Sequence, residues 1–196
     1  MDFDIAVVAS NRRKALIIDY LQNIQYKINF TPDYSLPENF QPKVIGLVQP
    51  SCHIGAYRCL RGHQDAISLF DGTKNMLIFE DDAVPNINSW IDICRVANQL
   101  TKQFEYVSIH SRQFDENQYE KKNIENIEYL VPKTNAAWAV ATLAYIITPE
   151  AGKKIKTWEY NGCPLDVLIY KQMNYCIVNP SPFNHNMSQG SLIDVR

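Results

Sequence analysis

The tetrapeptide Phe79-Glu80-Asp81-Asp82 follows the apolar segment at residues 75–78. That segment has the length and composition of a buried strand, so the three acidic residues stand where the strand ends. Adjacent carboxylates repel one another, and a folded chain holds them together only where solvent or a cation offsets their charge. Open α/β sheets bind their ligands at the carboxyl ends of the strands. The run therefore predicts either a divalent-metal site for a phosphorylated ligand or a solvated acidic turn that caps the next helix.

Short apolar segments alternate along the chain with amphipathic ones. This alternation predicts strands at residues 3–9, 43–49, 75–78, 104–110, 136–148 and 175–178, and helices at residues 12–24, 55–70, 87–103, from 149 onward and at 163–172. Residues 31–42 and the end from residue 180 are expected to be loop, 83–86 a turn into a helix, and 111–126 a solvated polar excursion. The pattern favours an α/β fold: one Rossmann-like domain over residues 1–196, with a mixed, mostly parallel sheet flanked by helices.

The bulk properties exclude several classes of protein. The 196 residues suit one domain, and the formal net charge of −2, with no basic block, argues against a protein that wraps nucleic acid. Five dispersed cysteines without a C-x-x-C pair argue against a disulfide framework and a structural zinc site, and favour a reducing cytoplasm. The acidic start is unlike a signal peptide, and no apolar run reaches membrane-spanning length. We expect a cytoplasmic protein without a transmembrane segment.

The acidic run offers oxygen ligands of the kind that Mn²⁺ and Mg²⁺ prefer. Residues two apart at a strand end point to the same side, so Glu80 and Asp82 are expected to face one ligand while Asp81 faces away. His185, in the polar C-terminal segment, becomes a further metal ligand if that segment folds back over the site, and is otherwise a solvated histidine.

Basic side chains near the start of the helix at residues 55–70 form a second candidate. Arg58, Arg61 and His63 can share one helical face and suit a diphosphate, or they belong to a surface helix with a satisfied histidine. Arg13, after the first strand, lies where a Rossmann-like half binds its nucleotide, or at a solvated helix start.

Asp166 opens a short helix within Pro164-Leu165-Asp166. It is either a favourable charge near a helix N-terminus or a carboxylate placed in the cleft as a general base. The chain has no G-x-S-x-G, Walker or H-E-x-x-H sequence, so covalent catalysis is disfavoured.

These pieces in order resemble glycosyltransferase family 25, which includes lipooligosaccharide and collagen galactosyltransferases and has relatives in large DNA viruses. The matching segments are Gly55-Ala56-Tyr57-Arg58-Cys59-Leu60-Arg61-Gly62-His63, Ile78-Phe79-Glu80-Asp81-Asp82-Ala83, Ala144-Tyr145-Ile146-Ile147-Thr148 with Glu150-Ala151-Gly152, and Pro164-Leu165-Asp166. Two features depart from the family pattern: Gly62 stands where a serine is usual, and Ser10-Asn11-Arg12-Arg13 only approaches the pattern of the first helix.

The resemblance implies a GT-A fold and a metal-dependent transfer of a sugar from a nucleotide-sugar, with UDP-glucose or UDP-galactose as the expected donor. A glycan or glycoprotein hydroxyl would be the acceptor, with inversion at the anomeric carbon. Mn²⁺ or Mg²⁺ would bridge the acidic run and the donor diphosphate. The resulting expectations are Glu80, Asp82 and His185 at the metal, Asp166 as the base, and Val8, Ala9, Ser10, Arg13, Arg58, His63, Glu80 and Asp81 around the donor.

Two other functions also use clustered carboxylates. One is a metal-dependent phosphohydrolase or nucleotidyltransferase, which normally needs further acids for a second metal. The other is a non-catalytic domain that binds a nucleotide or glycan.

Overall fold

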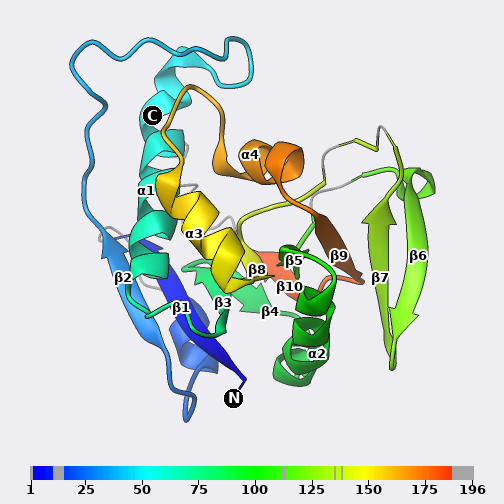
Figure 1. Ribbon diagram of the computed structural model, residues 1–196. Helices are drawn as coiled ribbons and strands as arrows, with labels where there is room; N and C mark the ends of the chain where they lie inside the picture. Colours follow the sequence, from blue (N-terminus) through cyan, green and yellow to red (C-terminus); the bar gives the residue numbers. More distant parts are fainter. Residues whose placement is uncertain (1, 11–15, 112–113, 135, 138, 187–196) are drawn as a thin grey trace.

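The computed structural model describes residues 2–10, 16–111, 114–134, 136–137 and 139–186 (Figure 1). Its main sheet contains β1 (Phe3–Ser10), β2 (Lys27–Thr31), β3 (Asn75–Glu80), β5 (Tyr106–Ser108), β6 (Tyr119–Ile124), β7 (Ile127–Pro132), β8 (Ala144–Ile147) and β9 (Tyr175–Asn179). A two-stranded sheet pairs β4 (Ala83–Pro85) with β10 (Phe183–His185). The α-helices are α1 (His53–Ser68), α2 (Trp90–Ala97), α3 (Pro149–Thr157) and α4 (Leu165–Gln172). The 3₁₀ helices are η1 (Leu16–Tyr20), η2 (Pro50–Cys52), η3 (Asn98–Lys102) and η4 (Glu116–Gln118).

The main sheet is mixed, with its eight strands in the order β2-β1-β3-β8-β5-β9-β7-β6. The strand pairs β1–β2, β1–β3 and β5–β9 are parallel, and the other four pairs are antiparallel. Following the pairs across the sheet, only β8 and β7 run against the direction of β1, so most of the strands share one direction. The prediction of an α/β, Rossmann-like fold with a mixed, mostly parallel sheet is confirmed.

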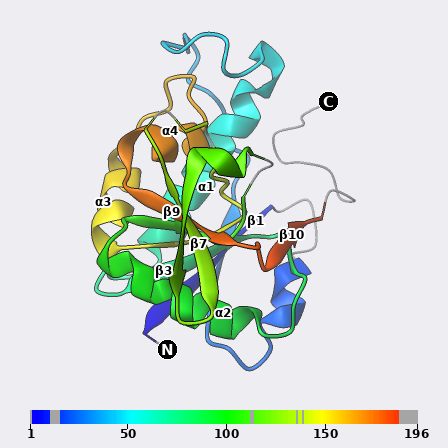
Figure 2. The same ribbon diagram turned by 90° about the vertical axis from the view of Figure 1, so that its right-hand side faces the viewer.

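Helices cover both faces of this sheet (Figures 1 and 2). Alternate residues of β1 belong to two hydrophobic clusters: Ile5 and Val7 share one with Trp90 of α2, whereas Ala6 and Val8 share the other with Leu60 of α1. Because successive side chains of a strand point to opposite faces, a strand that is apolar at nearly every position must be covered on both sides. The second cluster also contains residues of α3 and α4, so these helices lie on the face that α1 covers.

Several predicted elements are correct in kind. β1, α1, β3 and β9 match their predictions closely, and α3 begins at the predicted proline, where the Thr148 hydroxyl accepts a hydrogen bond from the backbone N–H of Ala151 (3.1 Å). Four other predicted elements are present but shorter than expected. The helix expected at residues 87–103 is α2 followed by η3, the strand expected at 104–110 is β5, the helix expected at 163–172 is α4, and the strand expected at 136–148 is only β8.

The helix predicted at residues 12–24 is wrong over its described part, which contains only the short η1. Leu21 is fully buried, as the apolar spacing required, and Ile17, outside that spacing, is buried as well, but Asn23 adopts a φ of 66°, which a continuing helix does not allow. The strand predicted at residues 43–49 is also wrong. That segment has no strand partner: Ile45 is 86% exposed, and Gly46 has a φ of 86°.

Further strands form in segments where none was predicted. Residues 83–85, expected to form a turn into a helix, form β4, and its partner β10 lies in the end that was expected to be loop. Residues 111–126, expected to be a solvated excursion, contain η4 and β6, which pairs with β7 as a hairpin at the sheet edge. β2 was not predicted, because only part of its surface is buried.

Candidate functional site

The three acidic residues lie at the side of the sheet where the parallel strands β1 and β3 end, which is called the carboxyl edge below. Val8 is the register partner of Glu80 in the parallel β1–β3 pair, so both strands end at this edge. β8 runs the other way and begins here, and the carbonyl oxygen of Leu143, just before it, accepts a hydrogen bond from the backbone N–H of Glu80 (2.8 Å). The segment that precedes β8 is therefore brought against the acidic run.

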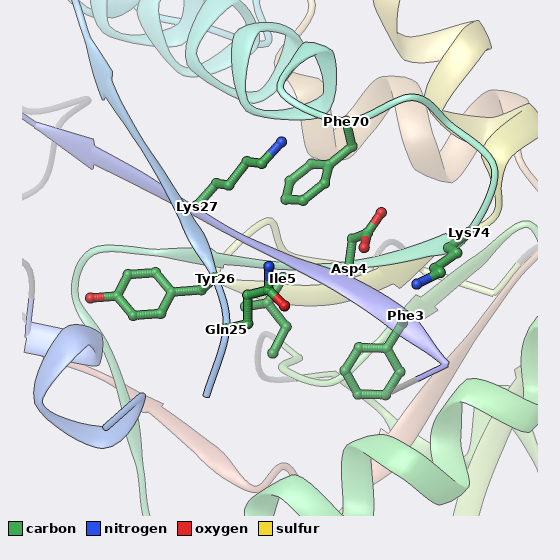
Figure 3. A pocket seen from close by; sticks show the side chains of 8 residues that line it. All are labelled: Phe3, Asp4, Ile5, Gln25, Tyr26, Lys27, Phe70 and Lys74. Carbon is green, nitrogen blue, oxygen red and sulfur yellow. The ribbon is translucent and has the colours of Figure 1, made fainter. Parts of the chain in front are cut away.

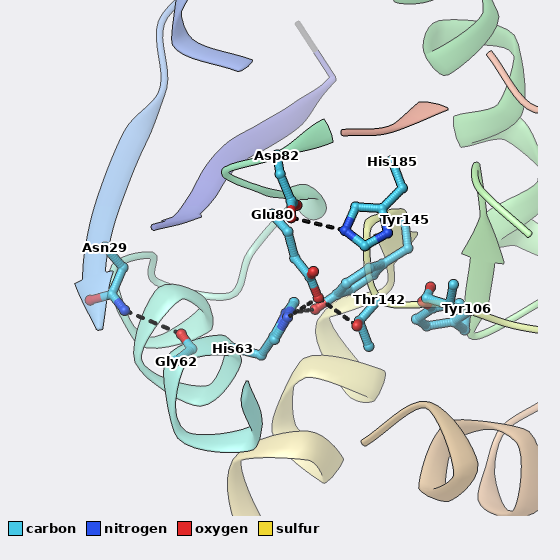
Figure 4. Close-up of polar contacts among 10 residues, drawn as sticks. Asn29, Gly62, His63, Glu80, Asp82, Tyr106, Thr142, Tyr145 and His185 are labelled. Carbon is cyan, nitrogen blue, oxygen red and sulfur yellow. Dashed lines mark hydrogen bonds and ion pairs between the residues drawn. The ribbon is translucent and has the colours of Figure 1, made fainter. Parts of the chain in front are cut away.

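Glu80 is held by two other residues, and a third fixes one of these two (Figure 4). Its Oε1 lies 3.2 Å from Nε2 of His63 and accepts a hydrogen bond from the Thr142 hydroxyl (2.5 Å). Nδ1 of His63 is in turn hydrogen-bonded to the Tyr145 hydroxyl (2.6 Å). Burial acts to raise the pKa of Glu80, but the hydrogen bonds and charge of His63, together with Thr142 and the charge of His185, lower it to about 2. The carboxylate is thus kept ionised at the strand end.

Asp82 and His185 form a second pair. Asp82 is buried, and its Oδ2 lies 2.9 Å from Nε2 of His185 (Figure 4). The β4–β10 pair produces this contact, because it places Ala83 opposite His185. The backbone N–H of Asn186 also donates to the carbonyl oxygen of Asp82 (3.0 Å). The C-terminal segment does fold back to the acidic run, as the metal-ligand hypothesis for His185 required.

The Asp82–His185 pair fits a hard divalent cation by its chemistry. Two ligands at about 2.1 Å from an octahedral ion lie about 3 Å apart, which matches the separation of these two donor atoms. Carboxylate and imidazole together suit Mn²⁺. Glu80 is within electrostatic reach of this pair, because the charge of His185 contributes to its lowered pKa.

Asp81 points to another part of the edge. Its Oδ2 accepts a hydrogen bond from the backbone N–H of Ser10 (2.7 Å), and its carbonyl oxygen accepts one from Leu16 (2.6 Å). The structure therefore brings two predicted site residues, Ser10 and Asp81, together at the end of β1. The side chains of Val8 and Ala9 are buried in the core beside them. Arg13 lies outside the described residues.

Arg58 and Asp166 occupy different surroundings. Nε of Arg58 donates to the carbonyl oxygen of Tyr34 (2.9 Å), and its guanidinium lies 3.5 Å from Asp33, so this side chain holds the loop after β2. Asp166 is buried in the first turn of α4, where its Oδ1 accepts a hydrogen bond from the backbone N–H of Val167 (2.9 Å). Burial raises the pKa of Tyr106, and the charges of Tyr145, Asp166 and Glu80 raise it further. Tyr106 therefore lies within electrostatic reach of both carboxylates.

Tyrosine hydroxyls fix the described part of one segment, residues 136–137 and 139–142, beside the site. Three of them donate to its backbone carbonyl oxygens: Tyr170 to Ala136 (2.8 Å), Tyr119 to Ala137 (2.5 Å) and Tyr106 to Ala141 (2.7 Å). The segment ends at Thr142, whose hydroxyl donates to Glu80. Sequence reasoning missed Thr142 and these tyrosines, because their partners are distant in the chain and no motif marks them.

Cys59 also belongs to the surroundings of Glu80. One donor atom each from Cys59, His63 and Glu80 lie within 4.8 Å of one another, which makes this trio a possible metal-binding group. The sequence carries a partial signal for it, since Cys59 and His63 are four residues apart on one helix and therefore share a face. A mixed set of this kind contains no C-x-x-C pair.

A cavity of about 260 Å³ lies at the opposite edge of the sheet (Figure 3). Phe3 and Asp4, at the start of β1, and Lys74, just before β3, line it. Lys27 places its ammonium group 4.4 Å from the centre of the Phe70 ring there. Because this cavity contains none of the acidic run, it does not enlarge the site at the carboxyl edge.

No helix in the described residues combines the length and the apolar character needed to cross a bilayer. No family model and no curated protein sequence matches the chain.

Solved structures do resemble it. A197 from STIV is 14% identical with a TM-score of 0.50, and the match covers 95% of this chain and 87% of that one. A glycosyltransferase involved in the glycosylation of the major capsid of PBCV-1 is 13% identical with a TM-score of 0.45, over 86% of this chain and 75% of that one. HddC from Yersinia pseudotuberculosis is 10% identical with a TM-score of 0.39, over 89% and 68%. The likeness to A197 concerns the fold alone and agrees with the Rossmann-like arrangement described above.

Proposed function

We propose that this chain is a metal-dependent glycosyltransferase that transfers a sugar from a nucleotide-sugar, UDP-glucose or UDP-galactose, to a hydroxyl group of a glycan or glycoprotein. The observation that carries the proposal is the pairing of buried Asp82 with His185 at the carboxyl edge of the sheet, beside the ionised Glu80. This edge is where open α/β sheets bind nucleotides. The family 25 resemblance places the same acidic run in the donor site of a GT-A domain, here spanning residues 1–196.

Asp82 and His185 would hold Mn²⁺ or Mg²⁺, with Glu80 at the metal or at the ribose of the donor. When bound, the cation neutralises the negative charge that develops on the departing nucleoside diphosphate. His63 and Thr142 fix the orientation of the Glu80 carboxylate, and the Asp81–Ser10 hydrogen bond fixes the end of β1. The nucleoside would then lie along Val8, Ala9 and Ser10, with Arg13 near it.

Asp166 is the proposed general base. As the acceptor oxygen bonds to the anomeric carbon, the bond from that carbon to the diphosphate oxygen breaks, and the hydroxyl proton passes to the Asp166 carboxylate. Attack opposite the leaving group inverts the configuration. The segment held by the tyrosine hydroxyls ends at Thr142, beside Glu80, and would help to position the acceptor.

The proposal places the reaction in the cytoplasm. The five cysteines, all in the described parts of the chain, form no disulfide with one another, as suits a reducing compartment.

Calorimetric titration with a panel of UDP-sugars, first with Mn²⁺ and then with a chelator, tests the proposal. Micromolar binding of one donor only in the presence of metal supports it, and product analysis with a glycan acceptor then identifies the transfer. Release of free phosphate without transfer would instead support a phosphohydrolase. Metal-dependent binding without turnover would support a non-catalytic binding domain.

A further inference from the structure

A second group of possible metal ligands shares Glu80 with the proposed donor site and differs from the Asp82–His185 pair in chemistry. Cys59 and His63 stand four residues apart on α1, and Glu80 ends β3, so a helix and a strand present three different donor types to one point. Their donor atoms all lie within 4.8 Å of one another, and the His63 Nε2 to Glu80 Oε1 distance is 3.2 Å. Nitrogen and oxygen ligands of a tetrahedral zinc ion lie about 3.3 Å apart, since each bond is about 2.0–2.1 Å long.

The surroundings of this group are those of a prepared metal site. Metal-binding histidines usually use their second ring nitrogen in a hydrogen bond that fixes the ring and its tautomer. His63 has such a bond, from Nδ1 to the Tyr145 hydroxyl (2.6 Å), and its Nε2 faces Glu80 (3.2 Å). The ligating carboxylate is likewise oriented, because the Thr142 hydroxyl donates to Glu80 (2.5 Å).

We propose that Cys59, His63 and Glu80 bind Zn²⁺. A thiolate is a soft ligand, which favours zinc over magnesium and manganese, whereas the Asp82–His185 pair contains no sulfur. Three protein ligands leave a fourth tetrahedral position for water or a ligand oxygen. Cys59 is partly exposed, so an ion can reach the group from solvent. Binding displaces the thiol proton to solvent, and no electron is transferred.

Cys52 provides a matched control. It lies at the start of α1, is also partly exposed, and is outside the group. The experiment uses the whole chain, reduced and stripped of metal, titrated with Zn²⁺ alone and separately with Co²⁺. The variants are Cys59→Ser and Cys52→Ser, each checked for folding by circular dichroism.

We expect one Zn²⁺ per chain whose binding depends on Cys59, apart from any ion at the Asp82–His185 pair, and a thiolate-to-cobalt charge-transfer band in the wild type. Cys59→Ser should bind Zn²⁺ at least about 100-fold more weakly, since losing even an outer-shell partner costs 10–100-fold in affinity. Cys52→Ser should differ from the wild type by less than about twofold, because it removes no ligand. Unchanged zinc affinity in Cys59→Ser, or a missing thiolate band in the wild type, would overturn the site.

A second measurement needs no variant. Saturating Zn²⁺ should slow alkylation of Cys59 in the wild type, read by peptide mass spectrometry, while Cys52 in the same molecules reacts at its original rate. Equal alkylation of Cys59 with and without Zn²⁺ would refute the proposal even if Cys59→Ser did not fold. Neither measurement uses a nucleotide-sugar, so its outcome is distinct from the test of glycosyl transfer.

Discussion

Gly62 stands where the resembling family usually has serine, and the structure predicts what a side chain there would do. A Cβ atom at this position would lie 2.4 Å from Oγ1 of Thr31, 3.2 Å from its Cγ2 and 3.1 Å from Cγ1 of Val8. Both branches of Thr31 and one branch of Val8 are close, so the Gly62→Ala change requires the Thr31 side chain to turn or α1 to move away from β1 and β2.

The expected magnitude follows from two opposing terms. Overpacking a core usually costs about 1–3 kcal/mol, whereas replacing glycine by alanine within a helix gains about 1 kcal/mol. The net loss should therefore be about 1 kcal/mol, which lowers the melting temperature by about 2–4 °C in a chain of this size. Because His63 is the next residue, the displacement should also weaken its contact with Glu80.

Thermal and urea unfolding measure the loss, and two variants isolate its cause. Thr31→Ala in the same chain removes both close branches and should restore most of the lost stability. Gly152→Ala, in α3, is the matched control, because its nearest contact would be 3.3 Å from one methyl group of Ile67, so it should cost less. A Gly62→Ala protein as stable as the wild type, or no recovery in the double variant, would refute the packing argument.

Three other predictions concern the site and the stability of the fold. Thr142→Val removes the hydroxyl that donates to Glu80. Calorimetry should show metal-dependent donor binding weakened about tenfold, because hydrogen bonds to charged groups contribute about 1.5–3 kcal/mol. Unchanged donor affinity would show that Thr142 does not orient Glu80 for donor binding. Asp166→Asn should bind donor normally but lose transfer, and full turnover would rule it out as the base. Burial acts to raise the pKa of Glu105, but hydrogen bonds from Lys154 and the backbone of Asn174 lower it overall, from an ordinary value of 4.5. The ionised Glu105 carboxylate therefore stabilises the fold above pH 4.5, and this stabilisation is lost as the pH falls below that value. The urea midpoint should fall less between pH 7 and about pH 3 in Glu105→Gln than in the wild type. Equal falls in the two proteins would contradict this.

Local signals in the sequence were sufficient for the centre of the fold. β1 and β3 are continuous apolar runs, and Thr148-Pro149 combines a capping hydroxyl with a proline in the first helical turn, so each could be recognised without knowing its partner. The peripheral strands lack such signals. β6 is polar because it lies at the edge of the sheet, where lysines are common.

The sequence was sufficient to predict which residue types form the candidate site, but not which of them contact one another. The acidic run and His185 could be selected as metal-binding residue types, yet their meeting depends on the β4–β10 pair, which joins segments about a hundred residues apart. Thr142 and Tyr145 belong to an apolar stretch whose pattern predicts only a strand. That their hydroxyls bond to Glu80 and His63 is seen only in the structure.

The central claim is that the acidic run holds the metal that binds the donor, and Asp82→Asn tests it most directly. Asparagine keeps the size of the side chain and can still accept a hydrogen bond from His185, but it removes the charge that binds the cation. Asp92→Asn, an exposed acid in α2, is the control.

Calorimetric titration of the UDP-sugar that the wild type binds, with Mn²⁺, should show at least about 100-fold weaker binding in Asp82→Asn, since a charged metal ligand is lost, and no change in Asp92→Asn. Equal donor affinity in the wild type and in Asp82→Asn would contradict the account.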